Sequence, residues 1–163
     1  MDRFTDFLRE TGLEGDAQAL CDCYVELLGR QRYILSGAKE FCRAVSARMP
    51  IYLITNGISQ IQRSRFGDCA ITPYLSGMVI SEEVGHAKPH PAMLYQALEM
   101  AGYAPQEAIV MGDSVTADIA AANAAGIESI LFTEGKEPPE GHGATYVART
   151  YREALDILLA KAE

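Results

Sequence analysis

Short apolar runs alternate with amphipathic stretches from residue 50 onward, and this alternation constrains the fold more than any other feature. The expected strands cover 51–54, 78–80, 108–111 and 129–132, with a last short strand near residue 146. The expected helices cover 58–65, 91–101, 115–125 and 151–160. Continuous apolar runs separated by helices of about ten residues are typical of a parallel sheet covered on both faces. We therefore predict a three-layer α/β domain.

The first 35 residues differ in texture, because they carry helical spacing and no strand. Their apolar residues fall into two helical blocks, Phe4, Phe7 and Leu8, then Leu20, Tyr24, Leu27 and Leu28. A third helix is expected from Ser36, as its N-cap, to about Arg48. We therefore divide the chain into a helical segment, 1–35, and an α/β core, 36–163.

Length, charge and hydropathy exclude several classes of protein. A chain of 163 residues makes one domain, or one domain with a small appendage. Its net charge of -8 disfavours a nucleic-acid polymer as partner. No apolar run reaches the roughly 18 residues of a membrane span, and the N-terminus lacks a secretory pattern, so a cytoplasmic protein is expected. The four cysteines lack metal-site spacing and are interpreted as reduced thiols.

Polar residues follow the first expected strand directly, as Thr55-Asn56-Gly57. Ligands of parallel α/β sheets bind beyond the carboxyl ends of the strands. A hydroxyl, an amide and free backbone N–H groups before a helix suit an anion such as a phosphate oxygen. In the alternative interpretation Thr55 only caps the next helix, and Asn56-Gly57 only makes a turn.

Lys88 is the only lysine or arginine between Arg65 and Lys136, in a stretch with nine acidic residues. Pro89 and Pro91 restrict the backbone around it, which favours a fixed position for the ammonium group. A solitary cation held in place suits a bound anion. The alternative is an ordinary surface lysine.

Asp113 ends the third expected strand, and Asp118 falls in the helix that follows. Both carboxylates can face one crevice. Carboxylate oxygens suit Mg²⁺, which binds through one or two carboxylates together with waters and substrate phosphate. In the alternative interpretation Asp113 or Ser114 caps the alanine-rich helix, which leaves Asp118 without a role.

Together these three junctions, in this order, resemble the haloacid dehalogenase superfamily of phosphohydrolases. Thr55 in Ile54-Thr55-Asn56-Gly57 is similar to the second family motif, Lys88 to the third, and Gly112 to Asp118 to the fourth. The stretch 80–85 is similar to the branch of pyrimidine and other nucleotide 5'-monophosphatases. The resemblance covers about residues 36–135 well and the remainder loosely.

The resemblance implies a Rossmann-like core and a Mg²⁺-dependent phosphatase of a small phosphomonoester, such as a nucleotide. By this resemblance Thr55, with the backbone amides at Asn56 and Gly57, would hold the phosphoryl group, and Lys88 would neutralise its charge. Asp113 and Asp118 would anchor Mg²⁺, and the expected catalytic residues are Thr55, Lys88 and Asp113. Residues 1–35 would be part of a helical cap.

The first family motif has no counterpart in this sequence. In the family, the nucleophile is the first residue of an Asp-x-Asp pair that ends the first core strand, between the strands with the second and fourth motifs. The aspartates here stand at 2, 6, 16, 22, 68, 113, 118 and 156, so no two are separated by one residue. Without that strand, backbone groups beside the site would be unpaired.

Three explanations stay open for the missing strand: truncation of a full enzyme, which we favour, a strand from a partner, or a sheet that closed into a noncatalytic domain. We expect this chain to belong to a lineage of Mg²⁺-dependent phosphohydrolases. The alternatives are a catalytically inactive phosphate- or metal-binding module and a self-associating domain that forms homo-oligomers through exposed apolar surface.

Overall fold

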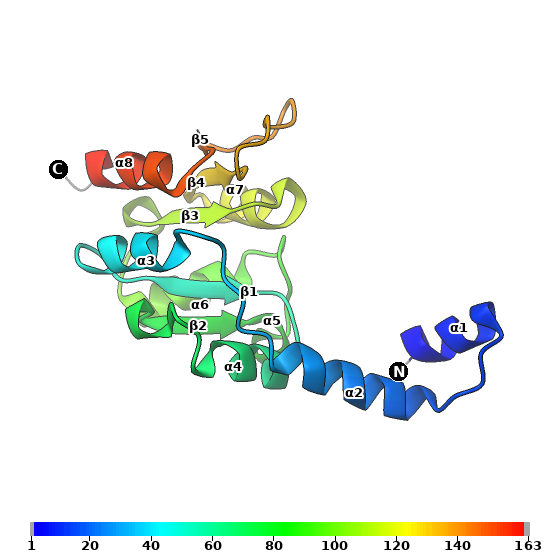
Figure 1. The fold of residues 1–163 in the computed structure, drawn as a ribbon. Coiled ribbons are helices and arrows are strands. Elements are labelled where there is room, and N and C mark those ends of the chain that lie inside the picture. The colour runs from blue at the N-terminus through cyan, green and yellow to red at the C-terminus, as the bar shows by residue number, and fades with distance from the viewer. Residues whose placement is uncertain (1, 162–163) are drawn as a thin grey trace.

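The fold is a parallel α/β architecture, as predicted, in a computed structural model that describes residues 2–161 (Figure 1). Its strands are β1 (Tyr52–Thr55), β2 (Gly77–Ile80), β3 (Ile109–Gly112), β4 (Glu128–Phe132) and β5 (Tyr146–Ala148). Each lies within a residue or two of its expected position. The apolar runs therefore identified the strands correctly.

Eight α-helices accompany the strands in the described part of the chain. They are α1 (Asp2–Thr11), α2 (Ala17–Gly29), α3 (Ala38–Ser46), α4 (Ser59–Gly67), α5 (Ser81–Val84), α6 (Ala92–Ala101), α7 (Ala120–Ala125) and α8 (Tyr151–Lys161). Short 3₁₀ turns lie at Thr72–Tyr74 and Pro105–Glu107. All helices expected from periodicity are present, whereas the four-residue α5 is too short for periodicity to reveal.

Two details of the helices differ from expectation. The N-cap of α3 is Gly37, with φ of 85° and no side-chain cap, so the assignment of Ser36 as N-cap was wrong. Glycine adopts this left-handed backbone without a steric penalty, which explains its place there. The helix expected over 115–125 begins as a π-helical turn, Val115–Ile119, before α7.

The strands form two separate parallel sheets instead of one continuous sheet. β1 pairs with β2, while β3, β4 and β5 pair in that order. Figure 1 shows β1 and β3 running side by side in the same direction, one at the edge of each sheet. Among residues 2–161 no strand lies between them, which is the place where the family resemblance puts the first core strand.

The two strands beside the gap are less buried than β4, which lies inside its sheet. β4 has a neighbour on both sides, and its last four residues are buried. β1 and β3 are also mostly apolar, but every residue in them is only partly buried. Strands with such apolar sequences are typical of a sheet interior. Both strands are therefore less buried along their open edges than their sequences predict.

Helices on both faces hold the two sheets together. On one face α6 and α7 contribute Leu94, Leu98 and Ala121 to a cluster that packs against Ile54 of β1 and Val110 of β3. On the other face α3 and α8 form a cluster with β4 and β5, flanked by the alternate side chains of β3. Because the α6–α7 cluster packs against both edge strands, it bridges the gap between the sheets.

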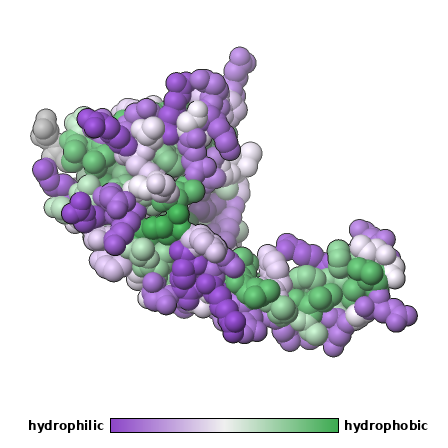
Figure 2. Space-filling model, viewed as in Figure 1, coloured by the Kyte–Doolittle hydropathy of each residue, from purple (hydrophilic) through white to green (hydrophobic). Residues whose placement is uncertain are grey.

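The helices α1 and α2 form an arm that leads away from the sheets (Figure 1). The ring of Phe4 lies 5.6 Å from the ring of Tyr24, which joins the two helices. At the base of α2, the Ser64 hydroxyl donates to Gly29 O at 2.9 Å. Apolar residues gather along the arm (Figure 2), and Phe7, Leu13 and Leu27 are exposed there. The role of residues 1–35 as part of a cap stays a prediction.

All four cysteines are free thiols, as the sequence interpretation expected. Within residues 2–161 no helix is both long and apolar enough to cross a membrane.

The fully buried Ile130 of β4 provides a test of this core. We expect Ile130→Ala to lower the free energy of unfolding by about 2–5 kcal/mol, because it leaves a cavity between β4 and α8. The matched control is Ile58→Ala, whose side chain is 46% exposed, and which should cost less than about 1 kcal/mol. Urea denaturation measures both, and equal losses would contradict the assigned core.

Candidate active site

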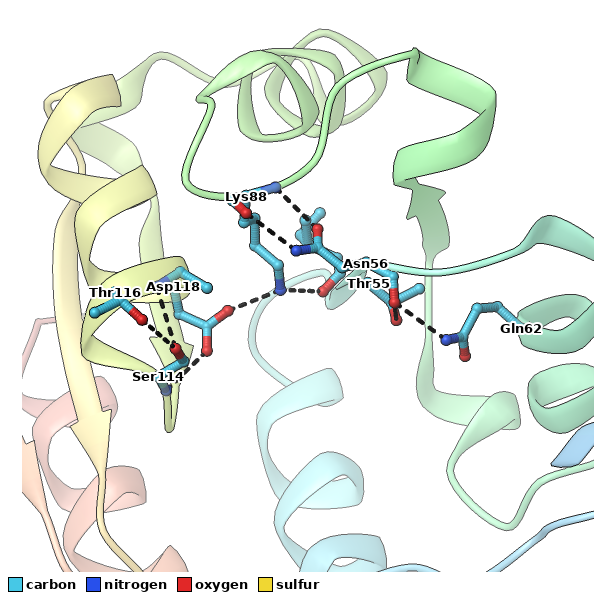
Figure 3. Close-up of polar contacts among 9 residues, drawn as sticks. Thr55, Asn56, Gln62, Lys88, Ser114, Thr116 and Asp118 are labelled. Atoms are coloured by element: carbon cyan, nitrogen blue, oxygen red, sulfur yellow. Dashed lines mark hydrogen bonds and ion pairs between the residues drawn. The ribbon is translucent and has the colours of Figure 1, made fainter. Parts of the chain in front are cut away.

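Three loops meet at the carboxyl ends of β1 and β3, and they carry the polar residues predicted from the sequence (Figure 3). Asn56 follows β1, Lys88 lies in the loop between α5 and α6, and Asp118 lies in the π-helical turn after β3. Figure 3 shows the Lys88 side chain reaching between the other two loops. The structure therefore brings together side chains from all three predicted motifs.

The ammonium group of Lys88 joins the two sheets. It donates to Asp118 Oδ1 at 2.7 Å and to the backbone oxygen of Ile54 in β1 at 2.8 Å. Both side chains of the ion pair are only 12% exposed. Removing one partner of such a poorly hydrated pair leaves the other charge uncompensated, which is far costlier than breaking a surface pair. Lys88 is therefore not an ordinary surface lysine.

Asn56 holds the backbone on which Lys88 stands. Its Nδ2 donates to Lys88 O at 3.1 Å, and the Lys88 N–H donates to Asn56 Oδ1 at 2.9 Å. Both ends of the amide are thus used to position Lys88. Sequence reasoning assigned Asn56 to phosphate and missed this positioning contact, because 32 residues separate the partners.

The neighbours of Asn56 have different surroundings. The Thr55 hydroxyl makes one long hydrogen bond, 3.5 Å, to Asn56 O. The Gly57 N–H donates to the Ser81 hydroxyl at 2.9 Å, so α5 already uses that donor. A Cβ at Gly57 would lie 2.6 Å from Nε2 of Gln62, which explains why glycine fits at this position.

The two predicted metal ligands are also unlike each other. Asp118 is buried, and its Oδ2 accepts from the Ser114 N–H at 3.0 Å. Asp113 is exposed and makes no hydrogen bond or ion pair with the described residues. Ser114 is the cap of the π-helical turn, since its hydroxyl accepts from the Ala117 N–H at 3.1 Å. Capping therefore explains Ser114 and leaves the Asp113 carboxylate free.

These carboxylates fit Mg²⁺ in chemical type. Between residues 2 and 161 no cluster of three or more His, Cys, Asp or Glu side chains is placed to hold a metal ion. Mg²⁺ does not need such a cluster, because it keeps several waters and takes one or two carboxylates plus substrate phosphate. Asp113 offers an unengaged carboxylate, and Asp118 offers a second one already held by Lys88 and Ser114.

The short helix α5 fixes the other side of the site, and sequence reasoning missed it. Glu82 Oε2 accepts from the Ser59 N–H at 2.8 Å, at the start of α4. Glu83 accepts two hydrogen bonds from Arg63, at 2.7 and 2.8 Å. Hydrogen bonds from Arg63 and Ser59 hold the pKa of the Glu83 carboxyl below its usual range. The sequence signal for these contacts was the acidic pair Glu82-Glu83, which follows β2 after Ser81.

Gly112 provides a test of the packing under Asp118. A Cβ at Gly112 would lie 2.4 Å from Cβ and Cγ of Asp118. We expect Gly112→Ala to displace Asp118 from Lys88 and to lower the free energy of unfolding by about 1–3 kcal/mol. Urea denaturation measures the change. The matched control is Gly67→Ala, where a Cβ meets nothing within 4 Å, and a loss as large there would contradict this explanation.

Known proteins of similar sequence include two pyrimidine 5'-nucleotidases. Pyrimidine 5'-nucleotidase PynA of Streptococcus pneumoniae is 33% identical over 162 residues, which cover 96% of this chain and 67% of that protein. Pyrimidine 5'-nucleotidase YjjG of Escherichia coli is 36% identical over 129 residues, covering 78% of this chain but 57% of that protein. The chain thus matches only part of the length of these relatives.

Solved structures show the same fold. The putative HAD-hydrolase YfnB of Bacillus subtilis, solved bound to magnesium, superposes with a TM-score of 0.85 at 27% identity, covering 96% of this chain and 69% of that one. The model of the family described as haloacid dehalogenase-like hydrolase matches residues 3–126, which include the arm as well as the three loops. The chain therefore belongs to the haloacid dehalogenase-like hydrolases.

Proposed function

We propose that this chain provides the phosphate- and Mg²⁺-binding part of a phosphatase that acts on small phosphomonoesters. The observation that carries the proposal is the pairing of Lys88, the one cation of a long acidic stretch, with Asp118 beside the free carboxylate of Asp113. The names of PynA and YjjG make a pyrimidine nucleoside monophosphate the first substrate to test.

Each residue has a role that its surroundings support. The Thr55 hydroxyl and the backbone amides after β1 would hold phosphoryl oxygens. Lys88 would neutralise their charge from a position fixed by Asn56. The Gly57 N–H donates to the Ser81 hydroxyl in this structure. It would give up that hydrogen bond to donate to a phosphate oxygen. Phosphoryl transfer depends mainly on such positioning and on charge stabilisation.

Asp113 and Asp118 would hold Mg²⁺, which supplies charge neutralisation to the phosphoryl group when bound. The two carboxylates differ in how they can serve. Asp113 is free to bind directly, whereas Asp118 is held in place by Lys88 and the Ser114 N–H. Asp118 therefore also keeps the lysine aligned with the metal site.

None of the roles above supplies the nucleophile of the reaction. The sequence has no Asp-x-Asp pair, and the described residues have no strand between β1 and β3 to carry one. We infer that a polypeptide segment other than these 163 residues supplies the nucleophile. This chain alone would then bind metal and phosphate without turning substrate over.

Calorimetric titration tests the binding role. We expect the chain to bind Mg²⁺, and to bind inorganic phosphate more tightly when Mg²⁺ is present, because the cation and Lys88 share the anion's charge. Asp113→Asn should weaken Mg²⁺ binding at least about tenfold. This substitution removes no hydrogen bond or ion pair in the structure, so the variant should fold normally.

The matched control is Asp156→Asn on α8, an exposed aspartate on a helix that carries none of the site residues. It should leave Mg²⁺ and phosphate binding unchanged. The proposal is wrong if neither ligand binds the natural chain, or if both aspartate substitutions weaken Mg²⁺ binding equally.

A further inference from the structure

Gln62 is a buried polar residue that none of the roles above explains. It lies in α4 and is only 7% exposed. Burial of an amide group is unfavourable unless the nitrogen and the oxygen both find hydrogen-bond partners. A glutamine buried to this extent therefore needs a specific explanation.

The amide nitrogen of Gln62 contacts the loop that follows β1. Its Nε2 donates to the backbone oxygen of Asn56 in a long hydrogen bond of 3.4 Å. The same nitrogen packs over Gly57, where an added Cβ would lie 2.6 Å from it. Figure 3 shows Asn56 between Gln62 and Lys88. Gln62 thus contacts two consecutive residues of the loop expected to hold phosphate.

The amide oxygen of Gln62 has no partner. Among the described residues, no hydrogen-bond donor reaches its Oε1. Turning the amide over would not help, because Asn56 O is an acceptor and has to face the Nε2 donor. A buried acceptor without a partner lowers the stability of the fold. Gln62 therefore stabilises the fold less than an apolar side chain of the same size would.

The two residues that follow Gln62 attach α4 to its surroundings. Arg63 donates two hydrogen bonds to Glu83 of α5, at 2.7 and 2.8 Å. The Ser64 hydroxyl donates to Gly29 O of α2 at 2.9 Å. Because α4 is held on two sides in this way, the Gln62 side chain meets the loop at a fixed place.

Asn56 passes the contact on to the cation of the site. Its side-chain oxygen and nitrogen both bond to the backbone of Lys88. The ammonium group of Lys88 in turn reaches Asp118 Oδ1 at 2.7 Å. A shift of the Asn56 backbone would therefore move Lys88 relative to Asp118 and relative to a bound phosphate.

We propose that Gln62 is a positioning residue of the phosphate site, which favours the placement of Asn56 and Lys88 over the stability of the fold. It acts through Asn56 and touches neither phosphate nor Mg²⁺. Loss of stability in favour of a functional arrangement is common at protein sites. The effect on phosphate rests on the proposed function, whereas the placement of Lys88 can be measured without any ligand.

The substitution Gln62→Met tests the proposal, because it keeps the size of the side chain and removes both the Nε2 donor and the unpartnered Oε1. We expect the urea midpoint to stay the same or to rise. Without ligands, the Lys88 amide should exchange at least about threefold faster, since its acceptor, Asn56 Oδ1, is held less firmly. With Mg²⁺ present, the affinity for inorganic phosphate should fall at least about threefold.

The matched control is Gln60→Met, the same change at an exposed position of α4, which should alter none of these measurements. Natural rates of Lys88 exchange in Gln62→Met would overturn the proposal, and so would an unchanged phosphate affinity. Faster exchange that extends to β4, with a lower urea midpoint, would also overturn it, because Gln62 would then only stabilise the fold. If the natural chain binds no phosphate, the proposed function fails, and Lys88 exchange still decides the role of Gln62.

Discussion

The ion pair between Lys88 and Asp118 is the contact on which the site depends, because it joins two sheets that share no backbone hydrogen bond. Lys88 also reaches the Ile54 carbonyl of β1, so one ammonium group ties both sheet edges together at their carboxyl ends. The α6–α7 cluster, which packs against Ile54 of β1 and Val110 of β3, also connects the two sheets. Loss of either partner of a buried pair typically costs about 3–5 kcal/mol.

The rest of the site is arranged around this pair. Asn56 fixes the backbone of Lys88, and the Ser114 N–H fixes the carboxylate of Asp118. Gly112 leaves the space that Asp118 fills. Asp113 takes no part in this framework, so its carboxylate is the one that stays free for a ligand. A ligand that bound Asp113 would therefore leave the contacts between Lys88, Asn56, Asp118 and Ser114 intact.

Much of this arrangement could be predicted from the sequence. Short apolar runs predicted the positions of all five strands, and the polar residues after them placed Lys88 and Asp118 in one candidate site. The ion pair between the two was not predicted. Contacts between a side chain and distant backbone could not be predicted, such as Asn56 with Lys88, because they depend on how the loops meet. The Gly37 cap was missed because Ser36 fits the usual N-cap preference better than glycine does.

We propose that this chain, a member of the haloacid dehalogenase-like hydrolases, carries a phosphate and metal site without the nucleophile that would act on the bound phosphate. The most direct measurement is Mg²⁺-dependent phosphate release from a generic aryl phosphate by the purified chain and by its Asp113→Asn variant. We expect no turnover by the natural chain above the level of the variant. Turnover that is lost on substitution of Asp113 would contradict it, because these residues would then contain a nucleophile of their own.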